Sequence, residues 1–314
     1  MQELAGGVDV ECNRSIDGLW MRRIVTCDTK GFHWTERPHP RGGYGSTPSM
    51  TARLRAVRRI LPPSVSAWLQ LPALDAWQSA RELRYPVIKG ALLWDELRSK
   101  SFLQLYPFGA MLGALHNTVL SGPRCNALGQ LTPFNKLTLR AVEGKAGVHA
   151  AFVMCAVRRR EALSMRLDTA VAALATETRT LVHGRWSGGV LYKGEASNAA
   201  LGGPDFFYGP AEYDLGYLTA ELLEAAASEV VGSGRRATDR AMIGVRQFIE
   251  GYRAVRPFNS ALASAFVIYR LAGHLVAHDY WCDREGLQPA AEIEVEGLLA
   301  IVEYLLPEID TCML

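Results

Sequence analysis

The 314-residue sequence has almost no excess of charge of either sign. Lysine and arginine together number 34 against 32 aspartates and glutamates, which leaves a formal net charge of +2 at pH 7. Binding to the phosphates of DNA or RNA depends on a pronounced basic surface, and the overall composition does not provide one. The sequence therefore gives no reason to expect a nucleic-acid partner.

The sequence is equally poor in features that mark secreted or membrane proteins. Its 6 cysteines are widely spaced and form no CxxC pair, which indicates reduced thiols rather than a disulfide or zinc framework. The N-terminal stretch MQELAGGVDVECNRS has no basic region followed by an apolar run, so we expect no signal peptide. No segment reaches the ~20 uninterrupted apolar residues that a membrane-spanning helix needs. We expect a cytoplasmic protein without a membrane partner.

What is present is the composition of an ordered protein, with 49% hydrophobic and 21% charged residues. A chain of this length favours two packed units, which we place at residues 1–95 and 96–314. In the first unit, apolar and aromatic residues flank a DTKG turn and predict a hairpin, and TARLRAVRRIL predicts a helix. We expect an α+β protein with a small mixed lobe in front.

The second unit is dominated by helical periodicity. Apolar residues recur at helical spacing in 102–118, in 145–180 and in nearly everything after residue 210. The stretches LVH, VLY and AAL, between residues 181 and 201, are short apolar runs bounded by glycine, and they predict small strands between the helices. The larger, C-terminal lobe should therefore be helical with a few short strands.

Two segments of this lobe resemble the aminoglycoside phosphotransferase family and its protein-kinase-like fold. LVHGRWSGGVL at 181–191 is similar to that family's HGDxxxxN catalytic loop, and GPAEYDLGYLTAELLE at 209–224 is similar to its GDPxxDL segment. LGALHN, FIEGYRAVRP and LLAIVEYLLP, at 112–117, 248–257 and 298–307, are supporting matches. The resemblance implies a two-lobe kinase-like fold with a nucleotide site between the lobes.

The catalytic positions that the resemblance implies are substituted. The loop reads His183, Gly184 and then Arg185 where the family has its catalytic aspartate, and arginine cannot accept a proton from a hydroxyl group. Gly188 and Gly189 stand near the place of the metal-binding asparagine. The usual residues at both positions help to position substrate and metal in phosphoryl transfer.

The nucleotide-binding positions are also altered. Counting back from Asp214 places Gly202 at the metal-binding aspartate, with Asp205 three residues later as a displaced substitute. In the front lobe Thr35 falls at the phosphate-binding lysine, and Arg37 or Lys30 are alternative contacts to phosphate. We assign Thr35, Arg37, Gly202 and Asp205 to the nucleotide side of the site. The helix TARLRAVRRIL contains no glutamate to pair with a lysine.

Several of these residues have both a functional and a structural interpretation. We interpret His183 as a packed histidine that supports the loop, and Asp214 as a structural cap at a helix start. Arg185 either binds a phosphate or carboxylate of a ligand or forms a salt bridge within the protein. His274, His278 and Cys282 recur every four residues, a spacing that allows metal ligands, but their apolar surroundings favour a buried face and we expect no metal site.

These substitutions predict a pseudokinase-like binding or scaffold subunit with no cofactor. HGR followed by ALGGPDFFYGPAEYDLG also resembles phosphotransferase-like proteins that accompany a lyase-like partner in the biosynthesis of lanthipeptides and thioamitides. That resemblance implies a precursor peptide and a lyase-like protein as partners, with dehydration of Ser or Thr as the step. The alternative is an active phosphotransferase that uses ATP and magnesium through displaced residues such as Asp205.

Overall fold

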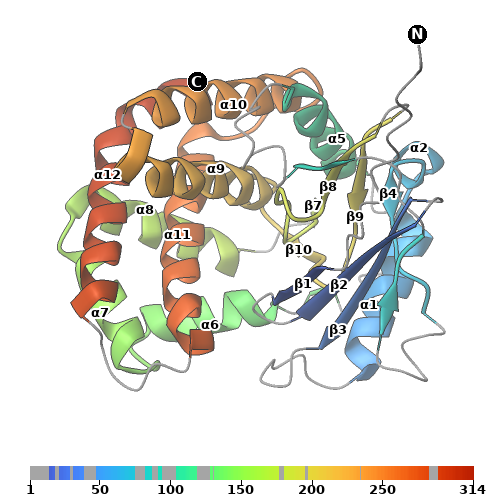
Figure 1. Cartoon of the computed structure of the whole chain (residues 1–314), viewed down its shortest axis with the longest axis horizontal. Helices are drawn as coiled ribbons and strands as arrows, with labels where there is room; N and C mark the ends of the chain where they lie inside the picture. Colours follow the sequence, from blue (N-terminus) through green and yellow to red (C-terminus); the bar gives the residue numbers. More distant parts are fainter. Residues whose placement is uncertain are drawn as a thin grey trace, which may run out of the picture.

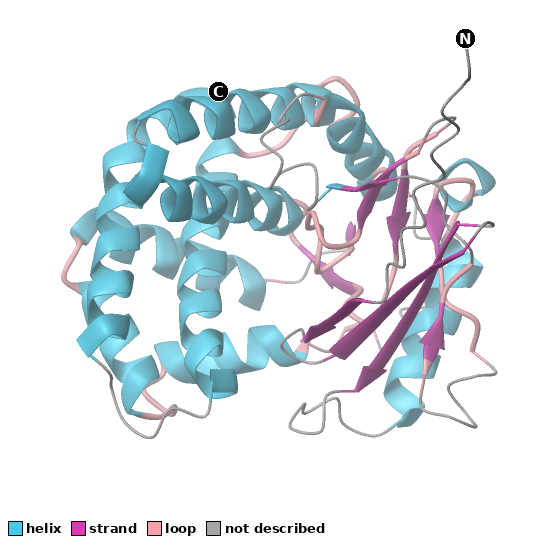
Figure 2. Cartoon of the chain, in the orientation of Figure 1, coloured by secondary structure: helices cyan, strands magenta, loops and turns pink. Residues whose placement is uncertain are grey.

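The structure of the protein is a computed structural model. It describes residues 14–17, 21–28, 31–38, 47–74, 82–86, 91–93, 104–118, 128–129, 131–176, 180–194, 197–233, 235–282 and 289–314. Strands gather in one half of the molecule and helices fill the other (Figure 2). The expected α+β arrangement of a mixed part beside a larger helical part is therefore present.

The front of the chain forms an antiparallel sheet in the order β1-β2-β3-β5. Its strands are β1 (Arg14–Asp17), β2 (Met21–Asp28), β3 (Gly31–Pro38) and β5 (Leu83–Arg84). β2 and β3 pair from Met21↔Pro38 to Asp28↔Gly31, which confirms the hairpin predicted around the DTKG turn. Helix α1 (Thr47–Ile60) follows and lies behind this sheet in the view of Figure 1.

A second sheet joins the two halves of the sequence. Its order is β4-β9-β8-β6, with β4 (Leu69–Gln70) and β6 (Ala91–Leu92) from the front and β8 (Leu191–Lys193) and β9 (Ala199–Leu201) from the back. The short helix α2 (Pro63–Ser66) leads into β4. β7 (Thr180–Val182) and β10 (Phe207–Gly209) form a separate antiparallel pair. The three predicted strands β7, β8 and β9 are confirmed.

The helical half is built on α9 and α11, which pack against each other and against most of the remaining helices (Figure 1). Its helices are α5 (Tyr106–His116), α6 (Pro133–Val142), α7 (Val148–Arg158), α8 (Glu161–Ala175), α9 (Glu212–Ser233), α10 (Arg235–Arg253), α11 (Ser260–Cys282) and α12 (Pro289–Met313). The stretch 145–180, predicted as one or two helices, contains α7 and α8.

One helix in the described part of the chain is long and apolar enough to cross a membrane by length and composition. This is α11, over Ser260–Ala277, and 72% of that window is buried inside the protein. Its apolar character is accounted for by packing in the helical core.

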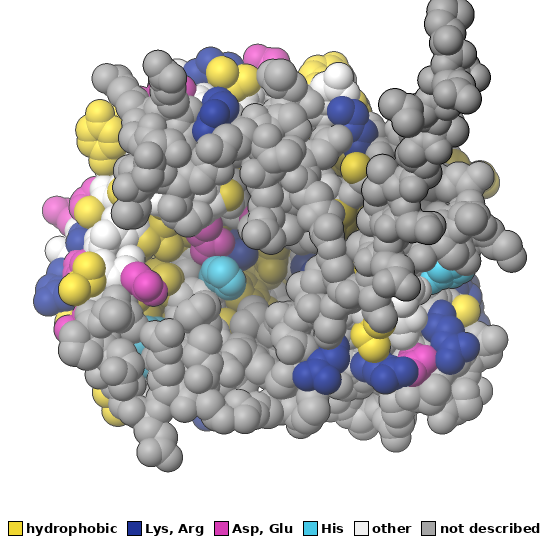
Figure 3. Space-filling model, viewed as in Figure 1, with side chains coloured by type: hydrophobic (Ala, Val, Ile, Leu, Met, Phe, Trp, Pro, Cys, Tyr) yellow, Lys and Arg dark blue, Asp and Glu magenta, His cyan; other side chains and the backbone are white. Residues whose placement is uncertain are grey.

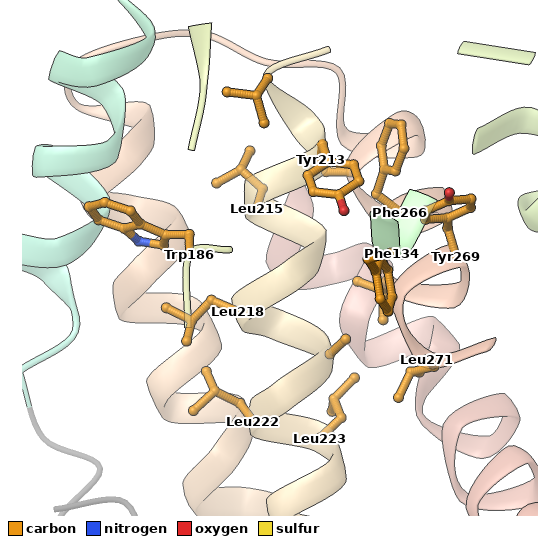
Figure 4. Packing of buried hydrophobic residues seen from close by; sticks show 14 of the residues in the cluster. Phe134, Trp186, Tyr213, Leu215, Leu218, Leu222, Leu223, Phe266, Tyr269 and Leu271 are labelled. Carbon is orange, nitrogen blue, oxygen red and sulfur yellow. The ribbon is translucent and has the colours of Figure 1, made fainter. Parts of the chain in front are cut away.

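The core at the α9–α11 contact combines leucines with interlocking aromatic rings (Figure 4). Tyr213 of α9 meets Phe266 and Tyr269 of α11 with ring centroids 5.5 and 6.2 Å apart, and Phe134 of α6 lies 6.5 Å from Tyr269. All of these side chains are buried. Each such buried ring or leucine contributes roughly 1.5–3 kcal/mol, so this contact fixes α9 and the segment that leads into it.

Glycine allows two other helices to cross closely. A Cβ atom at Gly251 of α10 would lie 2.0 Å from the Tyr106 carbonyl oxygen of α5, and one at Gly109 of α5 would lie 2.0 Å from the Phe248 carbonyl oxygen of α10. Backbone therefore faces backbone on both sides of the crossing, and a methyl group cannot be accommodated without separating the helices.

We expect Gly251→Ala to lower the free energy of unfolding by about 2 kcal/mol, because overpacking costs roughly 1–3 kcal/mol. Gly297→Ala in α12 is the matched control, since a Cβ atom there would have no neighbour within 4 Å and alanine is favoured over glycine inside a helix by about 0.5–1 kcal/mol. Urea denaturation of the two variants measures the difference. Equal stability of the two variants would contradict the close crossing.

Candidate functional site

The loop that resembles a kinase catalytic loop runs from His183 to Val190, between β7 and β8. Gly184 has a φ of +79°, and a Cβ there would lie 2.1 Å from the Asp205 carbonyl oxygen. Only glycine fits both the left-handed backbone and this close approach. The loop is therefore packed directly against the segment that follows β9.

Asp214, in the first turn of α9, holds the start of this loop. Its Oδ2 accepts a hydrogen bond from the His183 amide at 2.7 Å, and its Oδ1 accepts one from the Gly184 amide at 2.9 Å. His116 Nε2 of α5 donates to Oδ2 at 3.1 Å, and its Nδ1 accepts from the Tyr252 hydroxyl at 2.9 Å. These contacts of Asp214 are structural. They differ from the predicted helix cap, because the amides that Asp214 binds belong to the loop and not to its own helix.

His183 supports the loop from inside. Its Nε2 donates to the Leu201 carbonyl at 2.9 Å, its Nδ1 accepts from the Arg185 amide at 3.3 Å, and its ring packs edge-on against Trp186 and Phe206. Burial lowers the pKa of His183, even though the carboxylate of Asp214 acts in the opposite direction. A neutral ring with both nitrogens engaged is a structural element rather than a proton-transfer group.

Arg185, at the position of the catalytic aspartate, forms a buried ion pair with the front sheet. Its Nη2 lies 2.9 Å from Glu36 Oε1 of β3, and Arg23 Nε of β2 donates to the same oxygen at 2.9 Å. The Tyr85 hydroxyl donates to Glu36 Oε2 at 3.0 Å. The sequence left two interpretations of Arg185, a ligand contact and an internal salt bridge. The observed contacts are those of an internal salt bridge.

Glu36 is completely buried, yet it is held as a carboxylate. Burial raises its pKa, but the guanidinium groups of Arg185 and Arg23 and the Tyr85 hydrogen bond outweigh this effect, so that the pKa lies below its ordinary value. Kinases place a lysine on the strand and a carboxylate on the loop. Here the carboxylate is on β3 and the cation is on the loop.

The alternation of β3 explains why Glu36 rather than Thr35 faces the loop. Trp34 and Glu36 are buried, whereas Thr35 is half-buried on the opposite face and Arg37 is exposed. Arg37 Nε donates to Glu82 at 2.6 Å, on the outer face of the sheet. The structure therefore does not bring Thr35 and Arg37 to the loop. Trp34 is apolar and must face inward, and residues two apart on a strand share a face. The sequence could therefore have identified Glu36 as an inward-facing residue.

A side chain at Gly202, which the sequence comparison placed at the metal-binding aspartate, would displace the apolar side chains packed around it. A Cβ there would lie 2.6 Å from Leu71 Cδ2 and 2.8 Å from Phe206 Cε2. Leu71 is brought there because β4 pairs in parallel with β9 and the Gly202 amide donates to the Gln70 carbonyl at 2.9 Å. Apolar packing occupies the space that a metal-binding carboxylate would need.

Asp205, the displaced substitute, lies against the arginine of the loop. Its Oδ2 is 3.4 Å from Arg185 Nε, and its side chain is buried. In the part of the chain that the structure describes, no group of three His, Cys, Asp or Glu residues is arranged to hold a metal ion. Together with the packed Gly202, these residues do not fit a magnesium ion bridging nucleotide phosphates, and Lys30 lies outside the described residues.

A second polar cluster lies next to the loop, on α9 and α11. Glu221 Oε2 accepts a hydrogen bond from the Gly188 amide at 2.6 Å, and burial raises the pKa of Glu221 to about 7 despite the nearby Arg270. Glu224 Oε1 binds Arg270 Nη1 at 3.2 Å and His274 Nδ1 at 2.7 Å. Burial raises the pKa of Glu224, but these two partners dominate and hold it at about 2.

His274 thus pairs with a carboxylate, and the side chains of His278 and Cys282 lie outside the described part of the structure. The centre of the molecule is hollowed on the face in Figure 3, with histidine and acidic side chains beside a hydrophobic floor. The sequence did not predict a role for Glu221 and Glu224, because they occupy positions in a helix that no motif marks.

Neither a protein-family model nor a curated protein sequence matches the chain. Solved structures of similar fold, however, cover nearly all of it. A choline/ethanolamine kinase family protein from Mesorhizobium loti is 13% identical, with a TM-score of 0.56 over 96% of this chain and 92% of that chain. Amicoumacin kinase is 14% identical, with a TM-score of 0.57 over 95% of this chain and 88% of its own.

A microcompartment-associated aminopropanol kinase is also similar, with 14% identity and a TM-score of 0.54 over 94% of this chain and 91% of that chain. At these identities the likeness establishes the fold alone. The chain has the phosphotransferase fold of choline and aminoglycoside kinases, which confirms the fold expected from the sequence.

We expect the stability of the protein to fall as the pH rises through about 7, because of Glu221. Its pKa is about 7 in the folded protein against an ordinary value of 4.5, so the folded state binds this proton more tightly than the unfolded state does. The stability that the protonated carboxyl confers is complete below pH 4.5 and lost as the pH passes 7. Relative to the wild type, Glu221→Gln should gain about 2–3 kcal/mol between pH 5 and pH 8.

Urea denaturation at several pH values measures this gain, and glutamine keeps an oxygen that accepts the Gly188 amide. Glu308→Gln, at an exposed position of α12, is the control and should follow the wild-type pH profile. Parallel profiles for Glu221→Gln and the wild type would contradict the perturbed carboxyl.

Proposed function

We propose that this chain is a pseudokinase-like binding subunit, which keeps the fold of a phosphotransferase without its phosphoryl-transfer chemistry. The observation that carries the proposal is the buried network in which Arg185 and Arg23 bind Glu36 at 2.9 Å. This network lies where the loop of a kinase and its nucleotide-binding strand face each other.

The chemistry of phosphoryl transfer is incompatible with these groups. The reaction needs a carboxylate that orients the attacking hydroxyl and metal ions that neutralise the phosphates. Arg185 remains protonated and cannot act as a base. Glu36 stands where kinases place a lysine, and a carboxylate paired with Arg23 and Arg185 cannot take over the lysine's role of binding phosphate.

The network also holds the front sheet against the loop of the helical half. Removing one partner of a buried ion pair costs roughly 3–5 kcal/mol, because the other charge is left without compensation. Displacing Arg185 from Glu36 to admit a nucleotide would lose part of this stabilisation, although Glu36 would keep its contact with Arg23. The arrangement in which Glu36 contacts Arg185 is therefore the stable one. It holds the front sheet and the loop in one fixed relation, which suits a binding protein.

For the ligand and partner, we propose a ribosomally made precursor peptide and a lyase-like protein that acts on it in the cytoplasm. The similarity of the HGR loop and the following ALGGPDFFYGPAEYDLG segment to such biosynthetic proteins supports this assignment. In the cluster of Glu221, Glu224, Arg270 and His274, the side chains of His274 and Glu224 are partly exposed and offer polar groups to a peptide. The chain would then position the peptide while its partner performs the dehydration of Ser or Thr.

A second candidate is an active phosphotransferase, and the position of Asp205 favours it. This carboxylate lies beside the loop, 3.4 Å from Arg185. A rearrangement that released it from Arg185 would bring an acidic group near the place where a metal ion is held in kinases. In that case ATP and magnesium would bind together and depend on Asp205.

Calorimetric titration of ATP into the purified protein, with and without magnesium, separates the two functions. The binding-subunit proposal predicts no heat of binding up to millimolar ATP in either condition, and stable co-purification with a lyase-like partner protein. Magnesium-dependent binding that disappears in Asp205→Ala would establish the active enzyme instead. Asp168→Ala, at an exposed position of α8, is the matched control.

A further inference from the structure

A groove beside the front sheet adjoins the centre described above but does not include the loop from His183 to Val190. It has a volume of about 620 Å³ and lies between α1, the segment after β4 and the end of β5. Leu71, Leu74 and Pro86 give it apolar walls, and Tyr85 lines it as well. Arg58 and Arg84, both exposed, add its cationic groups.

The size and openness of the groove suit part of an extended chain. Its volume is within the ~300–1,000 Å³ typical of sites that bind drug-sized ligands, so it exceeds the needs of one side chain. Ala73 and Pro86, which line it, are exposed, and Leu71 and Leu74 are half-buried. Apolar surface that is partly open to solvent and bordered by charge is the character of a protein-interaction site.

The charged residues around the groove determine which kind of peptide segment it can bind. Helix α1 has the sequence TPSMTARLRAVRRI, with four arginines and no aspartate or glutamate. Arg55 and Arg59 are exposed beside Arg58 on the same helix. On the β5 side, Arg84 shares Glu82 with Arg37, so a single carboxylate serves two guanidinium groups there. Among the described residues around the groove, arginines therefore outnumber carboxylates, although the whole protein is nearly neutral.

The floor of the groove is connected to the substituted centre. Tyr85 lines the groove, and its hydroxyl donates to Glu36 at 3.0 Å. Leu71, which also lines it, occupies the space beside Gly202. A ligand in the groove would thus press on two side chains that define the arrangement of Glu36 and Gly202.

We propose that this groove docks an acidic, extended segment of a partner protein. Apolar side chains of that segment would pack on Leu71 and Leu74, and its carboxylates would pair with Arg58 and Arg84. Charge complementarity with the arginine-rich α1 carries the choice of an acidic partner. The docking does not rest on the absence of catalysis, because the groove lies outside the loop centre and is available in an active or inactive protein.

Selection of a phage-displayed library of random 12-residue peptides on the wild-type protein tests this directly. We expect the enriched peptides to combine Asp or Glu with large apolar residues. The best of them, synthesised with a fluorescent label, should bind Arg58→Glu and Leu74→Ala at least ten-fold more weakly than the wild type in a polarisation assay. Arg140→Glu, which makes the same charge change at an exposed position of α6, should leave its affinity unchanged.

Circular dichroism verifies that each variant is folded before its affinity is compared. Enriched peptides without acidic residues would overturn the proposal, as would a peptide that binds Arg58→Glu as tightly as the wild type. A peptide whose binding is lost equally in Arg140→Glu would show only non-specific attraction to positive charge, and it would overturn the assignment of the groove.

Discussion

Glu36 is a carboxylate removed from water, and the arrangement of the centre depends on how its charge is compensated. Arg23 reaches it from the neighbouring strand and Arg185 from a loop about 150 residues later in the chain. If one arginine leaves, the carboxylate keeps the other, and the loss of both would leave it as an isolated charge in a low-dielectric interior, which is costly. The pair between Arg185 and Glu36 therefore joins the front sheet to the loop.

The surroundings of this pair are arranged to keep the loop in place. Asp214 binds two successive loop amides, His183 is fixed through both ring nitrogens, and Gly184 permits contact with the segment around Asp205. These contacts fix the conformation of the loop around Arg185. Leu71 and Phe206 fill the space next to Gly202, so the packing there suits a glycine.

The sequence predicted those parts of the molecule that depend on local patterns. The hairpin around Asp28 and Gly31, the helices of the back half and the three short strands all followed from periodicity and glycine placement. The arginine at position 185 and the glycine at position 202 were also visible, because they interrupt a motif of fixed spacing. A structural interpretation of His183 agrees with the contacts that the structure shows.

The partners of these residues depended on long-range pairing, which the sequence does not reveal. The inward position of Glu36 depends on the register of β3, and a one-residue shift exchanges the two faces of a strand. The contact of Leu71 with Gly202 depends on the parallel pairing of β4 with β9, whose members are about 130 residues apart. The raised pKa of Glu221 likewise arises from burial between α9 and the loop, and no local pattern marks it.

A double-mutant cycle between Glu36 and Arg185 tests the central interaction most directly. Glu36→Gln and Arg185→Met remove each charge while keeping much of the side-chain volume, and urea denaturation of both single variants and the double variant yields their coupling. We predict a coupling free energy of about 2 kcal/mol, within the range of ~0.5–3 kcal/mol found for directly interacting residues. Additive effects would show that the two residues act independently and would contradict the account of an ion pair that closes the centre.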